Sequence, residues 1–277
     1  MMNLFSWMKW ETIPKTVSPT ATTLPRLSYC GTNLQGIGSR SQQEDAFGFV
    51  NIFDVTKIQE MGMLAIVADG MGGMQGGKFA SETAVSTLKN DFCQMNPQYP
   101  YTQQLLKSAR NASERIFQRL DGTGGSTLVA CIIYQEQLYY VSVGDSFLYL
   151  KRNGELYRIN REQNILHQCY RKAIQNGEIS LTNEYDTNDE PNALTSFLGM
   201  EHLEDLDYFI NPLPVRHGDV LLLCSDGVGG VLTNEQILKA LECSTPQESC
   251  AVLEQNILMA NKAYQDNYTA LVIQCAY

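Results

Sequence analysis

The chain has 277 residues, of which 30 are Asp or Glu and 20 are Lys or Arg, so its formal net charge at pH 7 is −10. This length is ample for a buried core, whereas an acidic chain without a basic stripe is disfavoured as a nucleic-acid-binding protein. No apolar run approaches the roughly 20 residues that span a bilayer.

Residues 1–26 are predicted to form an N-terminal tail or linker. The start, MMNLFSWMKWETIPK, has Lys9 and Glu11 within a short apolar stretch and lacks a small-residue cleavage site, unlike a secretory signal. Three prolines stand among Ser and Thr at 14–25, a composition typical of linkers. Aromatic residues leave a weak membrane or partner anchor as an alternative, but membrane contact is not expected. One domain is predicted over 27–277.

Apolar patterning in that domain predicts blocks of strands and helices. Runs rich in β-branched and aromatic residues predict strands at 45–53, 63–68, 126–134, 137–143, 147–151, 155–159, 219–224 and 268–275. Helical periodicity predicts helices at 78–95, 102–120 and about 234–242, and another after a capping box at Thr245, Pro246 and Glu248. Residues 160–200 lack a strong period and are predicted to be irregular. Consecutive strand hairpins indicate an α+β fold with antiparallel sheets.

Carboxylates recur at the ends of the predicted strands. Four strands have one at a terminus, and two more open the first strand; the set is Asp69, Asp145, Asp226, Asp266, Glu44 and Asp45. Any one of them alone is explained by the preference of Asp for turns and caps. Together they form an oxygen-only set of the kind that Mg²⁺ or Mn²⁺ prefers. Without a cation, such neighbours would repel one another and their pKa values would rise.

Other chemistries find little support in the sequence. The three histidines, His167, His202 and His217, lie far apart and fit no zinc motif. No GxSxG elbow indicates a catalytic serine. The glycines at 72–77 lack the GxxxxGK[ST] pattern of a phosphate-binding loop, so we expect them to let the backbone approach a metal site closely.

The eight cysteines are too few for a disulfide scaffold, and none has CxxC spacing. Several of them, including Cys131, Cys224 and Cys275, stand inside apolar runs, where Cys behaves as a small hydrophobic residue. We therefore expect reduced thiols in a cytoplasmic protein.

Six short motifs give the chain a family resemblance. In order they are RSQQED at 40–45, VADGMGG at 67–73, GGST at 124–127, VGDS at 143–146, SDG at 225–227 and DNYT at 266–269. This series, over residues 30–277, resembles the metal-dependent Ser/Thr protein phosphatases of the protein phosphatase 2C family. The resemblance implies a four-layer αββα sandwich, in which helices flank two antiparallel β-sheets and metals sit at the edge where strand ends converge.

The resemblance also implies a role for each site residue. Asp69 would bridge two Mg²⁺ or Mn²⁺ ions, with the carbonyl of Gly70 on one and Asp226 and Asp266 completing the other. A hydroxide bridging the ions would attack phosphorus in line, without a covalent intermediate. Arg40 would hold the substrate phosphate, which suits its planar, permanently charged guanidinium.

Three further carboxylates have secondary roles by the same resemblance. Glu44 and Asp45 would act through metal-bound waters, and Asp145 together with Asp226 resembles the third-ion site of several family members. The catalytic residues implied are therefore Arg40 and Asp69, with two ions and provision for a third.

The chain departs from the family pattern at several positions. Met71 stands where many eukaryotic members have a His proposed as the general acid, and Met cannot donate a proton. Phe147 follows GDS where members often have Arg. In the flap-like segment 160–200, Glu162-Gln163-Asn164 replaces the Asp-His-Ser of many bacterial relatives, so a third-ion role for Glu162 is open. The Met form and the compact length indicate a bacterial type.

The leading hypothesis is an active protein phosphoserine and phosphothreonine phosphatase of a bacterial cytoplasm. Its expected partners are phosphorylated proteins, the substrates of a Ser/Thr kinase, and it is expected to be a monomer that binds no nucleic acid. One alternative is a catalytically inactive regulator or binding module with the same fold, which substituted metal ligands would mark. Another is a metal-dependent phosphohydrolase acting on a small molecule or nucleic acid, of which the acidic charge disfavours the latter.

Overall fold

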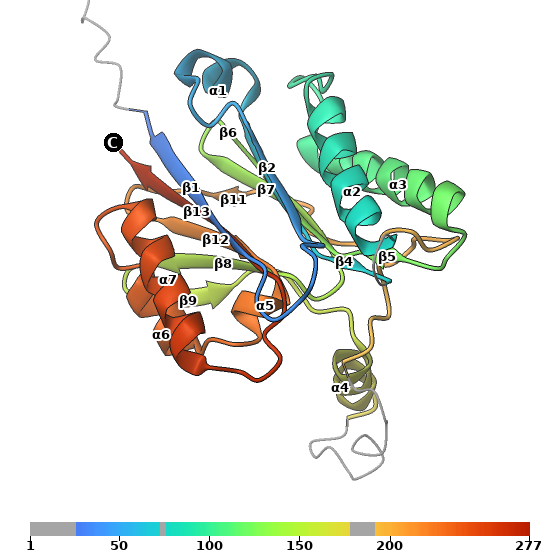
Figure 1. The fold of residues 1–277 in the computed structure, drawn as a ribbon. Helices are drawn as coiled ribbons and strands as arrows, with labels where there is room; N and C mark the ends of the chain where they lie inside the picture. The colour runs from blue at the N-terminus through green and yellow to red at the C-terminus, as the bar shows by residue number, and fades with distance from the viewer. Residues whose placement is uncertain (1–25, 73–75, 178–191) are drawn as a thin grey trace, which may run out of the picture.

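The computed structural model describes residues 26–72, 76–177 and 192–277 (Figure 1). The predicted N-terminal tail, apart from Arg26, and the middle of the predicted flap, 178–191, lie outside the described residues.

Two large antiparallel sheets form the centre of the domain. The five-stranded sheet has the order β1 (Ser28–Gly36), β13 (Tyr268–Ala276), β12 (Val220–Cys224), β8 (Phe147–Arg152) and β9 (Glu155–Arg158). The six-stranded sheet has the order β10 (Asp207–Tyr208), β7 (Gln137–Val143), β6 (Leu128–Tyr134), β3 (Met63–Ala68) and β2 (Ala46–Val50), with β11 (Leu213–Pro214) also on β7. A small ladder pairs β4 (Gly70–Met71) with β5 (Gly125–Ser126).

Helices cover the outer face of each sheet (Figure 1). On the six-stranded sheet lie α2 (Gly76–Phe92) and α3 (Tyr101–Leu120), and on the five-stranded sheet lie α6 (Asn234–Ala240) and α7 (Pro246–Ala260). The other helices are α1 (Val55–Met61), α4 (Ile165–Gln175) and α5 (Asp226–Gly229). The layers are therefore helix, sheet, sheet, helix, and the expected αββα sandwich is confirmed.

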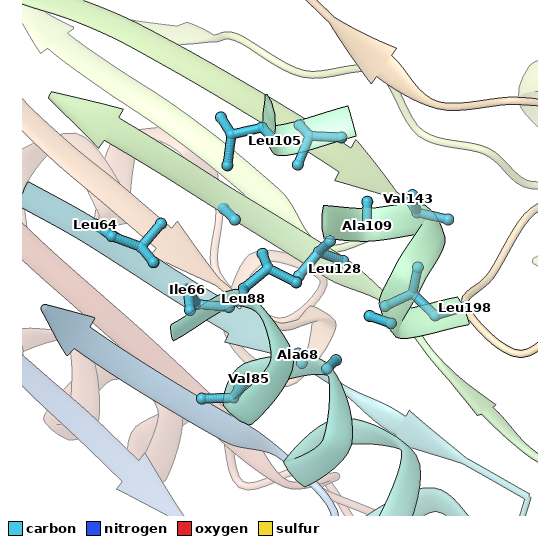
Figure 2. Close-up of a cluster of buried hydrophobic side chains, with 14 of the residues drawn as sticks. Leu64, Ile66, Ala68, Val85, Leu88, Leu105, Ala109, Leu128, Val143 and Leu198 are labelled. Carbon is cyan, nitrogen blue, oxygen red and sulfur yellow. The ribbon is translucent and has the colours of Figure 1, made fainter. Parts of the chain in front are cut away.

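Strand β3 shows how one sequence serves two cores. All six of its residues, MLAIVA, are fully buried, because both faces of the strand are covered. Leu64, Ile66 and Ala68 pack toward α2 and α3, beside Leu88 and Leu105 (Figure 2). The alternate residues of the strand join the core between the two sheets. A continuous apolar run bounded on both faces thus places the residue that follows it, Asp69, at a rigid edge.

Most predicted elements are present with small shifts of their ends, but several short or polar elements were missed. Strand β1 contains Gly and polar residues. Only two of its residues are buried, so its sequence does not alternate regularly between apolar and polar residues. Helices α1 and α5 are short, and α4 buries only Ala173. The prediction that 160–200 is irregular is therefore wrong over α4, where Asn164 caps the helix by accepting a hydrogen bond from the His167 amide at 2.9 Å.

Two further predictions from the sequence concern disulfide bonds and membrane-spanning segments. The described cysteines form no disulfide bonds. Cys131, Cys224, Cys250 and Cys275 are buried, whereas Cys30 and Cys93 are exposed and do not belong to the core. Among the described residues, none of the helices has the length and apolar character needed to traverse a bilayer.

The predicted capping box of α7 yields a stability test. Thr245 accepts from the Glu248 amide at 3.2 Å, and the Glu248 carboxylate accepts from the Thr245 amide at 3.2 Å. Replacing Thr245 by Ala should lower the free energy of unfolding by about 1 kcal/mol, measured by urea denaturation. The Thr245→Ser variant keeps the hydroxyl and should match the wild type; equal losses in both variants would contradict the capping account.

Candidate active site

Strand ends from both sheets deliver carboxylates to one edge of the sandwich. Asp69 follows β3, Asp226 follows β12, Asp266 precedes β13, Asp45 precedes β2, and Asp145 lies between β7 and β8. The charges of Asp45, Asp226 and Asp145 all raise the pKa of Asp69, after the larger effect of its burial. The structure therefore brings together the side chains that the sequence placed on separate strands.

The backbone of Asp69 is held by the neighbouring ladder. The Thr127 amide and the Ser126 hydroxyl both donate to the Asp69 carbonyl oxygen, at 2.8 and 3.0 Å. In return, the Asp69 amide donates to the Thr127 hydroxyl at 3.0 Å. The Thr127 and Ser146 hydroxyls are 2.7 Å apart, which links this anchor to the turn that carries Asp145.

Ser225, which directly precedes Asp226, holds the Asp45 carboxylate. The Ser225 hydroxyl donates to Asp45 Oδ2 at 2.8 Å and accepts from the Thr269 amide at 3.0 Å. Both carboxyl groups lie within hydrogen-bonding reach of Asp69. Ser225 begins the SDG motif but was not predicted as a site residue.

Asn267 fixes the Arg40 side of the site and was also missed as a functional residue. Its side chain accepts from the Glu44 amide at 2.8 Å and donates to the Ile37 carbonyl at 2.9 Å. Beside it, Arg40 Nη2 lies 2.5 Å from Asp266 Oδ2, and 57% of the Arg40 side chain is exposed. The sequence signal for Asn267 was its place in the DNYT motif, directly after Asp266 and before a strand.

A close backbone contact explains two of the glycines. A Cβ atom on Gly70 would lie 2.2 Å from the Gly77 carbonyl oxygen, so α2 can begin against the Asp69–Gly70 strand end only if residue 70 is Gly. The expectation that the glycines at 72–77 permit a close backbone approach is thus confirmed at Gly77, whereas Gly70 was not among them. Gly73 lies outside the described residues.

The carboxylates are held in a state that favours protonation or a cation. Burial, followed by the charges of neighbouring carboxylates, raises the pKa of Asp145 to about 7. Burial raises the pKa of Asp45 to about 6, against hydrogen bonds from Thr269 and Ser225, and it also raises the pKa of Asp226. Each cation that bound here would relieve this repulsion.

Unpartnered buried oxygens support the cation interpretation. Glu44 Oε1, Asp45 Oδ1 and Asp226 Oδ1 are buried without a hydrogen-bond partner. An oxygen-only donor set with free lone pairs fits a hard divalent ion. In the described part of the chain, however, no three His, Cys, Asp or Glu side chains already form a ligand group. Asp266 is paired with Arg40, so ion binding requires these side chains to exchange partners.

An open cleft of about 530 Å³ adjoins the carboxylates. Its walls include Asp145, Asp226 and Asp266, together with Phe147, Glu162 and Lys262. The cleft therefore runs from the convergent strand ends to the base of the predicted flap, and it offers room beside the carboxylates for part of a substrate.

The arrangement of motifs agrees with a known family. A sequence model of the family described as Protein phosphatase 2C matches residues 36–262, which include every carboxylate of the site except Asp266. The chain belongs to the protein phosphatase 2C family.

Relatives in this family are named as Ser/Thr phosphatases. The chain is 31% identical over 224 residues to the serine/threonine phosphatase stp of Listeria monocytogenes serotype 4b (strain F2365), across 76% of this chain and 84% of that protein. It is 28% identical over 218 residues to the serine/threonine protein phosphatase PstP of Mycobacterium tuberculosis, across 76% of this chain and 40% of that protein. This protein phosphatase 2C member is therefore a protein serine/threonine phosphatase.

Solved structures agree with the fold. The catalytic domain of PstP in complex with two manganese ions superposes with a TM-score of 0.71 at 26% identity, across 91% of this chain and 100% of that one. The Streptococcus agalactiae serine/threonine phosphatase gives a TM-score of 0.74 at 23% identity, across 89% and 99%, and supports the fold alone. The resemblance and the fold class expected from the sequence are confirmed.

The raised pKa values predict a pH-dependent effect of metal. Without metal, the contribution of Asp45 and Asp145 to stability is fully present below about pH 4 and is lost as pH rises through about 6 and 7. Excess Mn²⁺ should therefore raise the Tm more at pH 7.5 than at pH 5, where protons compete with it. At 100 times its Kd, an ion stabilises by about 2.7 kcal/mol. Scanning calorimetry with EDTA controls measures this, and equal shifts at both pH values would contradict it.

Proposed function

We propose that the chain hydrolyses phosphoserine and phosphothreonine in proteins, with two Mg²⁺ or Mn²⁺ ions held by the convergent carboxylates. The observation that carries this proposal is the group of buried, unpartnered carboxylate oxygens beside Arg40, on Glu44, Asp45 and Asp226. Membership of the protein phosphatase 2C family supports it. So does the likeness to the PstP catalytic domain, whose crystal structure is a complex with two manganese ions.

The proposed ligands divide into an inner and an outer group. Asp69, the Gly70 carbonyl, Asp226 and Asp266 would hold the two ions, and Glu44 and Asp45 would contact them through water. Asp145 is a further candidate at the flap end of the cleft. Two bound ions would neutralise charge on the phosphoryl group and lower the pKa of a water between them, and phosphomonoester hydrolysis needs both effects because it is very slow uncatalysed.

Arg40 would bind the phosphoryl oxygens of the substrate. Its guanidinium is exposed at the site, and its hydrogen bond to Asp266, with the charges of Asp266, Glu44 and Asp69, raises its pKa and keeps it cationic. A planar fork of N–H donors can make paired hydrogen bonds to phosphate. If Asp266 turned to bind an ion, Arg40 would lose its partner and become available to the substrate phosphate. One change of partner by Asp266 would therefore prepare both the metal site and the phosphate site.

The leaving group needs a proton that Met71 cannot supply. Met71 is half-buried in the β4 strand, and its thioether has no acidic hydrogen. The cleft is open, so solvent water can protonate the departing serine or threonine alkoxide.

The biological setting follows from the same features. Phosphorylated proteins would be the substrates, and a Ser/Thr kinase would supply them. Cysteines that form no disulfide bonds in the described residues suit a reducing bacterial cytoplasm. We further propose a monomer whose tail, residues 1–26, makes no membrane contact. None of the proposed ligands is substituted, so no observation favours an inactive regulator.

The central test replaces one proposed ligand. Asp69→Asn should lower kcat/KM for a phosphothreonine peptide with Mn²⁺ by at least about 100-fold, because an amide oxygen cannot supply the charge of the carboxylate. The matched control is Asp121→Asn, at the left-handed C-cap of α3, a conformation that Asn tolerates well. Activity that resists EDTA, or an undiminished rate in Asp69→Asn, would contradict the proposal.

A further inference from the structure

Glu162 is the residue for which the family resemblance leaves open a role as ligand of a third ion. It follows β9 by four residues, lines the cleft together with Asp145, and 17% of its side chain is exposed. From the sequence its role was open. Its contacts in the structure decide whether the carboxylate is available to an ion.

Both oxygens of Glu162 are already engaged. Arg158 Nη1 forms an ion pair with Oε1. On the other side, Asn164 Nδ2 donates to Oε2 at 2.8 Å, and His167 Nδ1 lies 3.4 Å from the same oxygen. Helix α4 begins directly after Asn164 and extends away from the sheets, so this cluster forms the base of the flap (Figure 1). An ion at Glu162 would have to displace a charge-assisted hydrogen bond that is partly shielded from water.

Arg158 is itself held in place by an aromatic stack. Its guanidinium carbon lies 4.1 Å from the centroid of the Phe147 ring, and that ring stacks on Tyr149 with centroids 5.6 Å apart. Arg158 Nε and Nη2 are buried without hydrogen-bond partners, so the stack and the Glu162 ion pair fix the group. Gly229 makes room for the ring, because a Cβ atom there would lie 2.5 Å from Phe147. The departure at Phe147 thus provides the platform for a cation from the neighbouring strand.

We propose that Arg158 and Asn164 hold the Glu162 carboxylate at the base of the flap, so that Glu162 is not a metal ligand and this enzyme binds two ions. The inference rests on the proposed function. Arg158 is a positioning residue: it pairs with Glu162 and holds the start of the flap against the cleft. Metal dependence then reflects the two-ion site alone.

Ion counting tests the proposal. The full chain at pH 7.5 is titrated with Mn²⁺, and free Mn²⁺ is followed by its electron paramagnetic resonance signal. The wild type should bind two ions per chain. Arg158→Met, which keeps the length but removes the charge, should bind a third, and Arg158→Met combined with Glu162→Gln should return to two.

Matched variants separate charge from damage to the fold. Arg158→Lys retains the cation and should bind two ions, as should Arg119→Met, which removes an exposed charge at the end of α3. If calorimetry shows that Arg158→Met does not fold, Arg158→Gln, which can still donate to Glu162, replaces it with the same expected count of three.

The outcomes distinguish the two proposals. Three ions on the wild type, with one lost in Glu162→Gln, would overturn this inference alone, as would a count of two in both Arg158→Met and Arg158→Gln. Fewer than two ions on the wild type would overturn the proposed function and, with it, this inference.

Discussion

The repulsion among carboxylates gathered at one sheet edge is the constraint on which the structure depends. Asp45 is buried, Asp69 and Asp226 are half-buried, and the pKa values of all three are raised, so their ionised forms are unfavourable without a counter-charge. In the proposed site, divalent ions would remove that penalty, and the bound ions would in turn give an acidic protein a positive surface for a phosphate dianion. The net charge of −10 therefore describes the protein as a whole but misrepresents its active site.

The sandwich makes this unfavourable cluster possible. Two sheets packed between helices give three apolar cores, and these fix the strand ends from which the carboxylates emerge. Hydroxyl and amide side chains then hold these residues in place. Thr127 accepts from the Asp69 amide, Asn267 accepts from the Glu44 amide, and Ser225 donates to the Asp45 carboxylate. Where cations from the protein itself are present, they pair with the cluster at both ends, Arg40 at Asp266 and Arg158 at Glu162. The two arginines differ, because the first is exposed and free to exchange, whereas the second is stacked on Phe147.

Local sequence patterns predicted the buried strands and the site carboxylates, but they did not predict the contacts between residues far apart in the sequence. Apolar runs such as MLAIVA located the buried strands, and the Asp that follows each run located the site. Strand β1 was missed because its backbone pairs with β13, about 240 residues away, while its own side chains show little alternation. The pairing of Arg40 with Asp266, 226 positions apart, depends on how the sheets stack. Glu162 looked like a candidate ligand in the sequence, and only its contacts with Arg158 and Asn164 changed that interpretation.

The most direct test of the metal centre is anomalous X-ray diffraction from crystals of the full chain grown with Mn²⁺, recorded on both sides of the manganese absorption edge. The account predicts two anomalous peaks at the strand-end site, with Asp69 in contact with both and Asp226 and Asp266 on one of them, and with Arg40 released from Asp266. Peaks elsewhere on the molecule, or an intact contact between Arg40 and Asp266 with no ion beside Asp69, would contradict it.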